Sequence, residues 1–304
     1  MQTQKIAIDI GYGDTKVFFN DKLFKFPSAI EQVRQTQVDL KEEKIDVYSY
    51  NGVHFRVGEK ALLNAIATRG FNFLTKYSPL LVFHAFKLAG VDLNKPIELA
   101  TGLSLLNFHK SKEFIEILND FSINKEYIKL DVTLFAQGQG IFLENKNEQD
   151  EIVGIIDIGY NTLDFLVFDK DSPRSDYCFA NQNGANKIIV DLQKMLTKEF
   201  KANISEQEAK KAFVNKSIKV LGEVVDLEDT IKTMTFSYMD MILDEVYNNC
   251  NDILVRADKI ILGGGGAYFL DEESIKDKYP NMIMAKTPHE FSNVRGYFLG
   301  AFKE

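Results

Sequence analysis

The chain has no tryptophan, four histidines and only two cysteines among its 304 residues. Cys178 and Cys250 lie far apart, without the short spacing of a metal or redox motif, so we expect reduced thiols and a cytoplasmic location. None of the histidines has a partner at metal-binding spacing, and no Ser-His-Asp arrangement is recognisable. These absences argue against a zinc protein and against a serine hydrolase.

Long apolar runs are also missing. The longest is far shorter than the roughly 20 residues that a membrane helix needs. The start, Met-Gln-Thr-Gln-Lys, has neither the basic region nor the apolar core of an export signal. We therefore expect no membrane partner.

Positive charge is in deficit, since 36 Lys and Arg residues stand against 44 Asp and Glu residues and the net charge is −8. A protein without an overall basic field is not expected to bind nucleic acid directly. The phosphate-binding pattern Gly-x-x-x-x-Gly-Lys-Ser/Thr is absent as well. Its absence disfavours a P-loop ATPase.

What the chain does have is an internal repeat. The pentapeptide Ile-Asp-Ile-Gly-Tyr stands at residues 8–12 and again, unchanged, at residues 156–160. Each copy ends a short apolar strand with an aspartate and a glycine, and a second strand follows, so each copy predicts a hairpin with a carboxylate at its tip. Two such hairpins predict two similar halves that close on one polyphosphate, with a metal ion between Asp9 and Asp157.

Around the repeats, strands and helices alternate, which predicts a duplicated α/β fold rather than a Rossmann pair. Ser78-Pro79 predicts the start of a helix over 78–89, because proline suits the first helical position. Ser205 with Glu208 predicts a capped helix start, and the polar run 144–151 predicts a linker. The other segments that we expect are strands at 4–10, 14–20, 22–26, 96–101, 127–136, 152–157, 162–168, 176–180, 258–262 and 281–284, hairpins at 51–52 and 217–225, helices at 58–66, 104–119, 185–200, 226–252 and from 288, and a polar loop to about 43.

The first hairpin carries residues suited to a phosphate group. Gly11 and Gly13 are expected to take positive φ and to turn backbone N–H groups toward a ligand. Lys16, on the outgoing strand, would place its ammonium group on the β- and γ-phosphates, and Asp9 would hold a metal-bound water. Either hairpin alone is more often a simple glycine turn, but two of them, each opening an α/β half, favour a nucleotide site.

The second hairpin repeats the arrangement with one change. Asn161 stands where the first copy has Gly13, and asparagine is the non-glycine residue best suited to a left-handed turn. Thr162 offers a hydroxyl group to a phosphate. Asp164 would face the attacking water or the metal ion.

Two further segments are candidates for the same site. Gly263–Gly266 follow an apolar strand and remove every side chain from the turn, so that adenine or ribose could lie against the backbone; a tight turn needed for packing is the alternative. Gln137 ends a strand and could orient an attacking water without becoming charged. Gln139 is a nearby competitor, and a loop glutamine of no consequence is the alternative.

In this order, the two hairpins and the glycine turn resemble the actin/Hsp70/hexokinase ATPase superfamily, and within it the actin-like proteins of the ParM type, which segregate plasmids. Further stretches are similar to segments of that type across essentially the whole chain. They are Val57–Leu62, Leu99–Leu103 (with Ser104 in place of a usual proline) and Pro288–Tyr297.

The resemblance implies a duplicated actin-like (ribonuclease H-like) α/β fold with two lobes around a nucleotide cleft. Domain I would comprise residues 1–150 and 288–304, and domain II residues 151–287. The cofactors would be ATP or ADP and Mg²⁺, held through water by Asp9 and Asp157. Gln137 and Asp164 would lie near the attacking water. Nucleotide contacts would come from Gly11, Tyr12, Gly13, Asp14, Lys16, Gly159, Tyr160, Asn161, Thr162, Glu206, Lys210, Gly263, Gly264, Gly265 and Gly266.

Tyr12 and Tyr160 depart from the small residues common at these turns, and they could crowd the γ-phosphate and slow hydrolysis. The function implied is that of an ATPase whose subunits assemble head to tail into filaments, with DNA or another cargo reached through an adaptor protein. Two alternatives remain open at this stage: a small-molecule kinase of the same superfamily and a non-hydrolysing actin-like scaffold.

Overall fold

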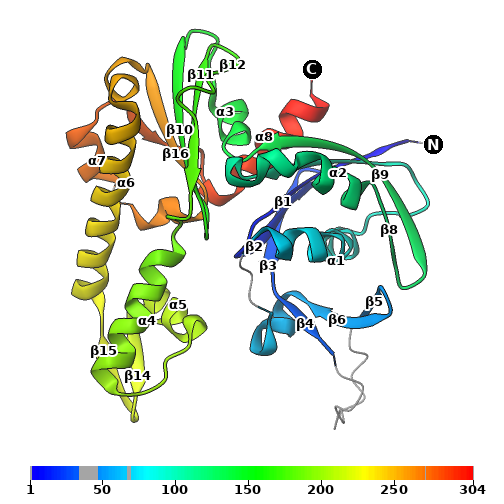
Figure 1. The fold of residues 1–304 in the computed structure, drawn as a ribbon, viewed down its shortest axis with the longest axis horizontal. Helices are drawn as coiled ribbons and strands as arrows, with labels where there is room; N and C mark the ends of the chain where they lie inside the picture. The colour runs from blue at the N-terminus through cyan, green and yellow to red at the C-terminus, as the bar shows by residue number, and fades with distance from the viewer. Residues whose placement is uncertain (1, 34–46, 67–69, 271, 304) are drawn as a thin grey trace. The chain divides into compact units, whose positions relative to one another are not determined.

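The structure is a computed structural model that describes residues 2–33, 47–66, 70–270 and 272–303. The polar loop expected up to about residue 43 therefore falls largely outside the described residues. The chain divides into two compact units, one formed by Met1–Lys146 with Ala285–Glu304 and the other by Asn147–Met284. Each unit is built around a sheet that contains one of the repeated hairpins, as the labels in Figure 1 allow the reader to follow. The described residues include no helix long and apolar enough to span a bilayer.

In the first unit, the main sheet has the strand order β3-β2-β1-β7-β9-β8, and a smaller sheet has the order β4-β6-β5. The strands are β1 Gln4–Ile10, β2 Asp14–Phe19, β3 Lys22–Pro27, β4 Ile30–Gln32, β5 Tyr48–Tyr50, β6 Val53–Val57, β7 Ile97–Leu103, β8 Asp120–Ile123 and β9 Glu126–Ala136. The α-helices are α1 Phe71–Ala89, α2 Ser111–Asn119, α3 Gln139–Asn145 and α8 Ser292–Phe302, with 3₁₀ helices at Gly58–Asn64, Leu105–Lys110 and His289–Phe291.

Strand β1 is covered on both faces, which explains its nearly continuous apolar sequence. Ile6 and Ile8 belong to a large apolar core that contains Phe83 and Phe86 of α1. Ala7, which points to the opposite face, belongs to a separate cluster with Val294 and Tyr297 of α8. The C-terminal helix therefore packs on the sheet of the first unit.

In the second unit, the main sheet has the order β12-β11-β10-β16-β17, β13 pairs with β11, and β14 and β15 form a separate hairpin. The strands are β10 Ile152–Ile158, β11 Leu163–Asp169, β12 Ser172–Pro173, β13 Phe179–Asn181, β14 Ser217–Val220, β15 Glu223–Asp226, β16 Lys259–Gly263 and β17 Met282–Met284. The helices are α4 Asn186–Phe200, α5 Glu206–Asn215, α6 Glu228–Arg256 and α7 Glu272–Lys278, with a 3₁₀ helix at Gly265–Phe269. One apolar core joins β10, α4, α5 and α6.

The two repeated hairpins have the same register, as the sequence repeat predicts. In β1–β2, Asp9 lies opposite Lys16, and in β10–β11, Asp157 lies opposite Asp164. In both units the first strand of the hairpin also pairs in parallel with a later strand, β7 in one case and β16 in the other. Lys16 and Asp164 therefore occupy equivalent positions, so that an ion pair in one hairpin corresponds to two carboxylates in the other.

Several predicted boundaries are wrong. Helix α1 begins at Phe71 rather than at Ser78, and Pro79 lies inside it. The rings of Phe71 and Phe73 are buried in the core, and burial of this size outweighs the hydrogen bond that an internal proline removes. The predicted helix 104–119 is a 3₁₀ helix followed by α2.

The predicted linker 144–151 begins inside a helix, because α3 extends to Asn145. Glu144 near the end of α3 forms an ion pair with Arg295 of α8 and accepts a hydrogen bond from Ser292. Helix α3 has too few residues to show an apolar period, and its close contact with α8 explains how so short a helix is stable.

Candidate functional site

Asp9 is the centre of the candidate site in the first unit. Its side chain is nearly fully buried at the end of β1. The Lys16 ammonium group donates to Asp9 Oδ2 at 3.1 Å, and the Gln137 amide Nε2 donates to Asp9 Oδ1 at 3.2 Å. Three residues that the sequence singled out are thus brought together around one carboxylate.

The loop after β1 differs from the expected geometry, since neither Gly11 nor Gly13 has a positive φ. Gly11 is required for a different reason. A Cβ at this position would lie 2.8 Å from the carbonyl oxygen of Asp14, where β2 begins, and 3.0 Å from Lys16 Nζ. The loop is therefore so tight that any side chain at position 11 would displace the backbone or the lysine.

Ser28 fixes this loop, and sequence analysis missed it. Its hydroxyl group donates to the Gly11 carbonyl oxygen at 2.5 Å, and its backbone N–H donates to the Gly13 carbonyl oxygen at 3.0 Å. The hydroxyl groups of Thr15 and Ser28 also lie 2.9 Å apart, both buried. No motif marks Ser28, because its position beside the loop depends on β3 turning back along β2.

Gln137 is held by the backbone on both sides. Its N–H donates to Leu103 at the end of β7. The next residue, Gly138, has φ 88° and donates its N–H to Asn293 Oδ1 of α8 at 3.0 Å. The competitor Gln139 instead accepts from the N–H of Ala136. Of the two glutamines, the structure therefore places Gln137 on Asp9.

The second hairpin and the glycine turn meet at Asp157. Gly263 pairs with Asp157 across the parallel ladder between β16 and β10. Gly264 has φ 83° and ψ 173°, a conformation that only glycine adopts readily. A Cβ on Gly264 would lie 2.5 Å from the Ile158 carbonyl oxygen and closer still to Asp157 Oδ1. The predicted turn thus brings its backbone directly against the carboxylate.

Asp157 and Asp164 form a pair of buried carboxylates. They lie directly opposite one another on adjacent antiparallel strands, so both side chains point to the same face of the sheet. The two side chains are 4% and 1% exposed. Two buried carboxyl groups in directly opposite positions are oxygen ligands of the kind that a bound cation uses.

Asn161 does not take the left-handed conformation that we expected, because its φ is not positive. Its side chain instead accepts a hydrogen bond from Asn186 Nδ2 at 2.9 Å. The N–H groups of Ala185 and Asn186, where α4 begins, donate to the carbonyl oxygens of Gly159 and Tyr160. The hairpin turn, including Thr162, is therefore tied to the start of α4. Position 184 requires a glycine, because an added Cβ would clash with the backbone of that turn.

Tyr160 connects the hairpin to helix α5. Its hydroxyl group donates to Glu206 Oε1 at 2.8 Å, and Lys210 Nζ lies 5.2 Å from the centre of its ring. The capping box of Ser205 and Glu208 that we predicted is present at the start of this helix. Glu206 and Lys210, which the resemblance implied as nucleotide contacts, thus contact the second hairpin through Tyr160. Tyr12 differs, because its ring belongs to the apolar core of the first unit.

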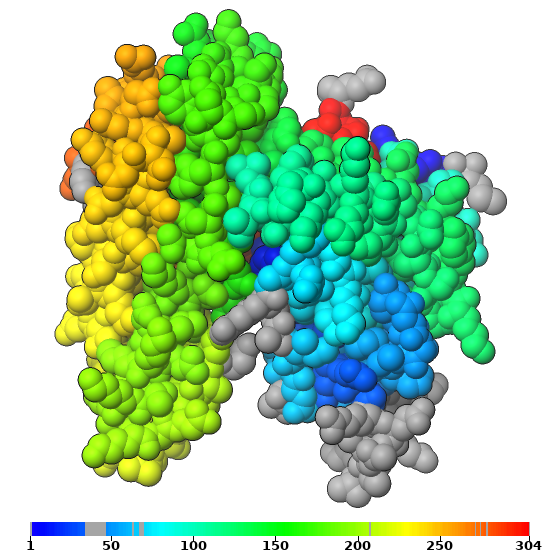
Figure 2. Space-filling model, in the orientation of Figure 1, coloured from blue at the N-terminus to red at the C-terminus, as the bar shows by residue number. Residues whose placement is uncertain are grey.

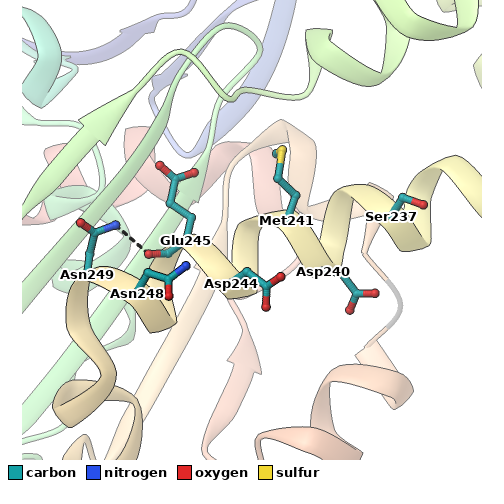
Figure 3. A pocket seen from close by; sticks show the side chains of 7 residues that line it. All are labelled: Ser237, Asp240, Met241, Asp244, Glu245, Asn248 and Asn249. Atoms are coloured by element: carbon teal, nitrogen blue, oxygen red, sulfur yellow. Dashed lines mark hydrogen bonds between the residues drawn. The ribbon is translucent and has the colours of Figure 1, made fainter.

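A pocket on α6 is unsuited to a nucleotide. It is lined by Ser237, Asp240, Met241, Asp244, Glu245, Asn248 and Asn249, and none of these is a residue that the sequence singled out. Figure 3 shows Met241 and Glu245 on one side of the helix and Asp240 and Asp244 on the other. Glu245 accepts hydrogen bonds from Asn181 and Asn183. Three carboxylates would repel a phosphate.

Each hairpin by itself offers carboxylates of the kind that Mg²⁺ binds. The described residues contain no group of three or more side chains able to hold a metal ion by themselves. Mg²⁺ keeps several waters and commonly uses one or two carboxylates together with the phosphates of a nucleotide. Buried Asp9 is an oxygen ligand of this kind in the first unit, and buried Asp157 and Asp164 are such ligands in the second.

Models of two actin-like families match the two halves of the chain. Residues 7–140 match the family described as actin-like proteins, N-terminal domain. Residues 155–275 match the family described as archaeal actin homologue MreB-like, C-terminal. No curated protein sequence matches the chain.

Solved structures match the chain from end to end. The native crystal structure of Ta0583, an archaeal actin homologue, is 21% identical, with 99% of this chain and 100% of that chain covered and a TM-score of 0.83. The same protein in complex with ADP gives 20% identity, the same coverage and a TM-score of 0.80. A subunit of a 15-stranded ParM filament from Clostridium botulinum gives 20% identity, coverage of 98% of each chain and a TM-score of 0.81. At this identity the likeness establishes the fold.

Proposed function

The chain belongs to the actin-like protein family, and on that basis we propose that it is a Mg²⁺-dependent ATPase whose subunits assemble into filaments. The observation that carries the proposal is the arrangement of the repeated hairpins. Asp9 is held by Lys16 and Gln137 in one unit, and Asp157 is packed against the glycine turn in the other. That a single nucleotide is shared by both hairpins stays a prediction from the sequence repeat.

The proposed phosphate contacts follow from the chemistry of the two loops. Lys16 is the cationic group of the first loop and would exchange part of its ion pair with Asp9 for a phosphate oxygen. In the second hairpin, the N–H groups and the Thr162 hydroxyl group would donate to phosphate oxygens. Mg²⁺, held through water by Asp9 and Asp157, would supply charge neutralisation at the phosphates.

We assign the orientation of the attacking water to Gln137. Because its Nε2 donates to Asp9, the amide is held with its carbonyl oxygen turned the other way, and this oxygen can accept a hydrogen bond from water. A glutamine remains neutral over the whole physiological pH range, so it can orient a water but cannot take its proton. Asp164, in the second hairpin, is the carboxylate that we assign to the same water.

Assembly into filaments is supported by the fold and by the state in which relatives were solved. A ParM filament subunit shares the fold over 98% of the chain, and the Ta0583 fold has been solved with ADP. Identical head-to-tail contacts that do not close generate a filament. With a net charge of −8, DNA or other cargo would be reached through an adaptor protein rather than by direct binding.

Sedimentation with and without nucleotide tests this proposal. The purified chain is incubated with Mg²⁺ and ATP, with Mg²⁺ and ADP, or with EDTA, and then centrifuged, and the pellets are viewed by electron microscopy. We expect filaments and release of phosphate with Mg²⁺ and ATP. If no assembled species forms with Mg²⁺ and ATP even at high concentrations of the chain, the filament assignment is contradicted, and assembly without nucleotide binding would contradict the ATPase assignment.

A further inference from the structure

Ser28 follows β3 directly, and its side chain is only 1% exposed. Strands β1 and β2, which flank the loop beside it, belong to the dark-blue part of the chain, and later residues cover most of them on the face shown in Figure 2. A hydroxyl group buried so deeply finds its hydrogen bonds inside the protein. The fold, and not water, therefore sets the direction of the Ser28 hydroxyl group.

The hydrogen bonds of this hydroxyl group have one possible direction. A hydroxyl group has a single hydrogen to donate, and the hydrogen of Ser28 goes to the carbonyl oxygen of Gly11 at 2.5 Å. The hydroxyl group of Thr15, which is fully buried 2.9 Å from Ser28 Oγ, must then be the donor to Ser28. A buried chain of hydrogen bonds thus runs from Thr15 through Ser28 to Gly11.

These bonds also fix two N–H groups of the loop. In a trans peptide the carbonyl oxygen and the following N–H group point in opposite directions. Ser28 holds the carbonyl oxygen of Gly11 through its hydroxyl group and that of Gly13 through its backbone N–H group. The N–H groups that follow, those of Tyr12 and Asp14, are therefore turned away from Ser28.

We propose that Ser28 is a positioning residue for the phosphates of the nucleotide, because it holds the first loop in the conformation that presents these N–H groups beside the Lys16 ammonium group. Backbone N–H groups of this kind form concavities that bind phosphate, and Lys16 Nζ lies close to Gly11. The inference rests on the proposed function, which supplies the phosphates. Ser28 acts through the loop, since its own hydroxyl group is engaged by Thr15 and Gly11.

Loss of the Ser28 hydroxyl group has a consequence for nucleotide affinity. The Gly11 carbonyl oxygen would lose its buried donor, and an unsatisfied buried carbonyl group is unfavourable. The loop of the free chain would then relax to other conformations. Binding of ATP would have to restore the original one, so the measured affinity would fall with the fraction of chains that retain it.

Ser28→Ala tests the proposal, and Ser78→Ala is the matched control. Ser78 is also buried in the first unit, but its Oγ has no hydrogen-bond partner among the described residues, so the same substitution removes no bond there. We expect Ser28→Ala to raise the dissociation constant of a non-hydrolysable ATP analogue with Mg²⁺ about tenfold in calorimetry. We expect Ser78→Ala to leave this constant unchanged.

Steady-state phosphate release separates positioning from a merely structural role. The loop would hold the phosphates equally before and during the reaction, so KM should rise about tenfold in Ser28→Ala while kcat is unchanged. A merely structural role would lower the melting temperature and leave both KM and the dissociation constant unchanged well below that temperature.

Thr15→Val is a second variant, of nearly the same volume, that removes only the first donor of the chain. It should raise the dissociation constant about threefold, and it decides the inference if Ser28→Ala does not fold. An unchanged affinity in folded Ser28→Ala, or an equal loss in Ser28→Ala and Ser78→Ala, would overturn the inference and leave the proposed function intact. Failure of the unchanged chain to bind ATP would instead overturn the proposed function.

Discussion

The contact between Gly264 and Asp157 gives a prediction whose size follows from the geometry. Gly264 has φ 83° and ψ 173°, a region that costs a non-glycine residue on the order of 1–3 kcal/mol. In Gly264→Ala, the added Cβ would also press on the Asp157 carboxylate, roughly 1 Å inside an ordinary contact. We expect a loss of about 2–4 kcal/mol in the free energy of unfolding. Because we propose that Asp157 holds Mg²⁺ through water, displacement of its carboxylate by about 1 Å should also lower ATP turnover on the order of a hundredfold.

Gly222→Ala is the matched control in the same unit. Gly222 also has a positive φ, but a Cβ there meets nothing within 4 Å. This variant should lose about 1 kcal/mol of stability and keep the turnover of the unchanged chain. Urea unfolding and phosphate release are measured for both variants below the concentration at which the chain assembles. Normal turnover in folded Gly264→Ala would refute the placement of Asp157 in the site.

Further predictions concern three other positions. Gln137→Ala should slow phosphate release at least about tenfold and leave the ATP dissociation constant within about twofold. Gln139→Ala should leave both quantities unchanged. Equal slowing of phosphate release in both variants would remove Gln137 from its role. Tyr160→Phe removes the hydrogen bond to Glu206 and should weaken ATP binding about fivefold in calorimetry. Tyr177→Phe removes a similar bond to Asp252 and should leave ATP binding unchanged. Equal ATP affinities of the two variants would show that α5 does not contribute to nucleotide binding. The backbone N–H groups of Ile152 and Glu151 hold the pKa of Asp258 below its usual value, so the ionised Asp258 carboxylate stabilises the fold at neutral pH, and this effect is lost as the pH falls through the folded pKa. Asp258→Asn should therefore be less stable than the unchanged chain at pH 7 and equally stable in strong acid. A difference in stability that persists in strong acid would contradict this.

The features that could be predicted from the sequence are those with local causes. The repeated hairpins follow from the alternation of apolar residues and the glycine after each aspartate, and the start of α5 follows from Ser205 and Glu208. The register that places Lys16 opposite Asp9 follows from the short turn between β1 and β2. These signals lie within a few residues of one another, so a single sequence contains them in full.

The features that were missed depend on contacts between distant residues. Gly11 and Asn161 do not take positive φ, because Ser28 and α4 hold their loops in other conformations. The Gly138 turn that positions Gln137 is fixed by Asn293, on a helix near the end of the chain. Helix α3 depends on its contact with α8 in the same way. No local pattern could indicate these partners, since each pair comes together only when the sheet of its unit has formed.

The central claim is that the two repeated hairpins bind one Mg²⁺ and one nucleotide together. Isothermal titration calorimetry with a non-hydrolysable ATP analogue and Mg²⁺, below the assembly concentration, tests it most directly through the stoichiometry. The account predicts one nucleotide per chain, with affinity lost in both Asp9→Ala and Asp157→Ala. Two nucleotides per chain, or full affinity in either variant, would contradict it.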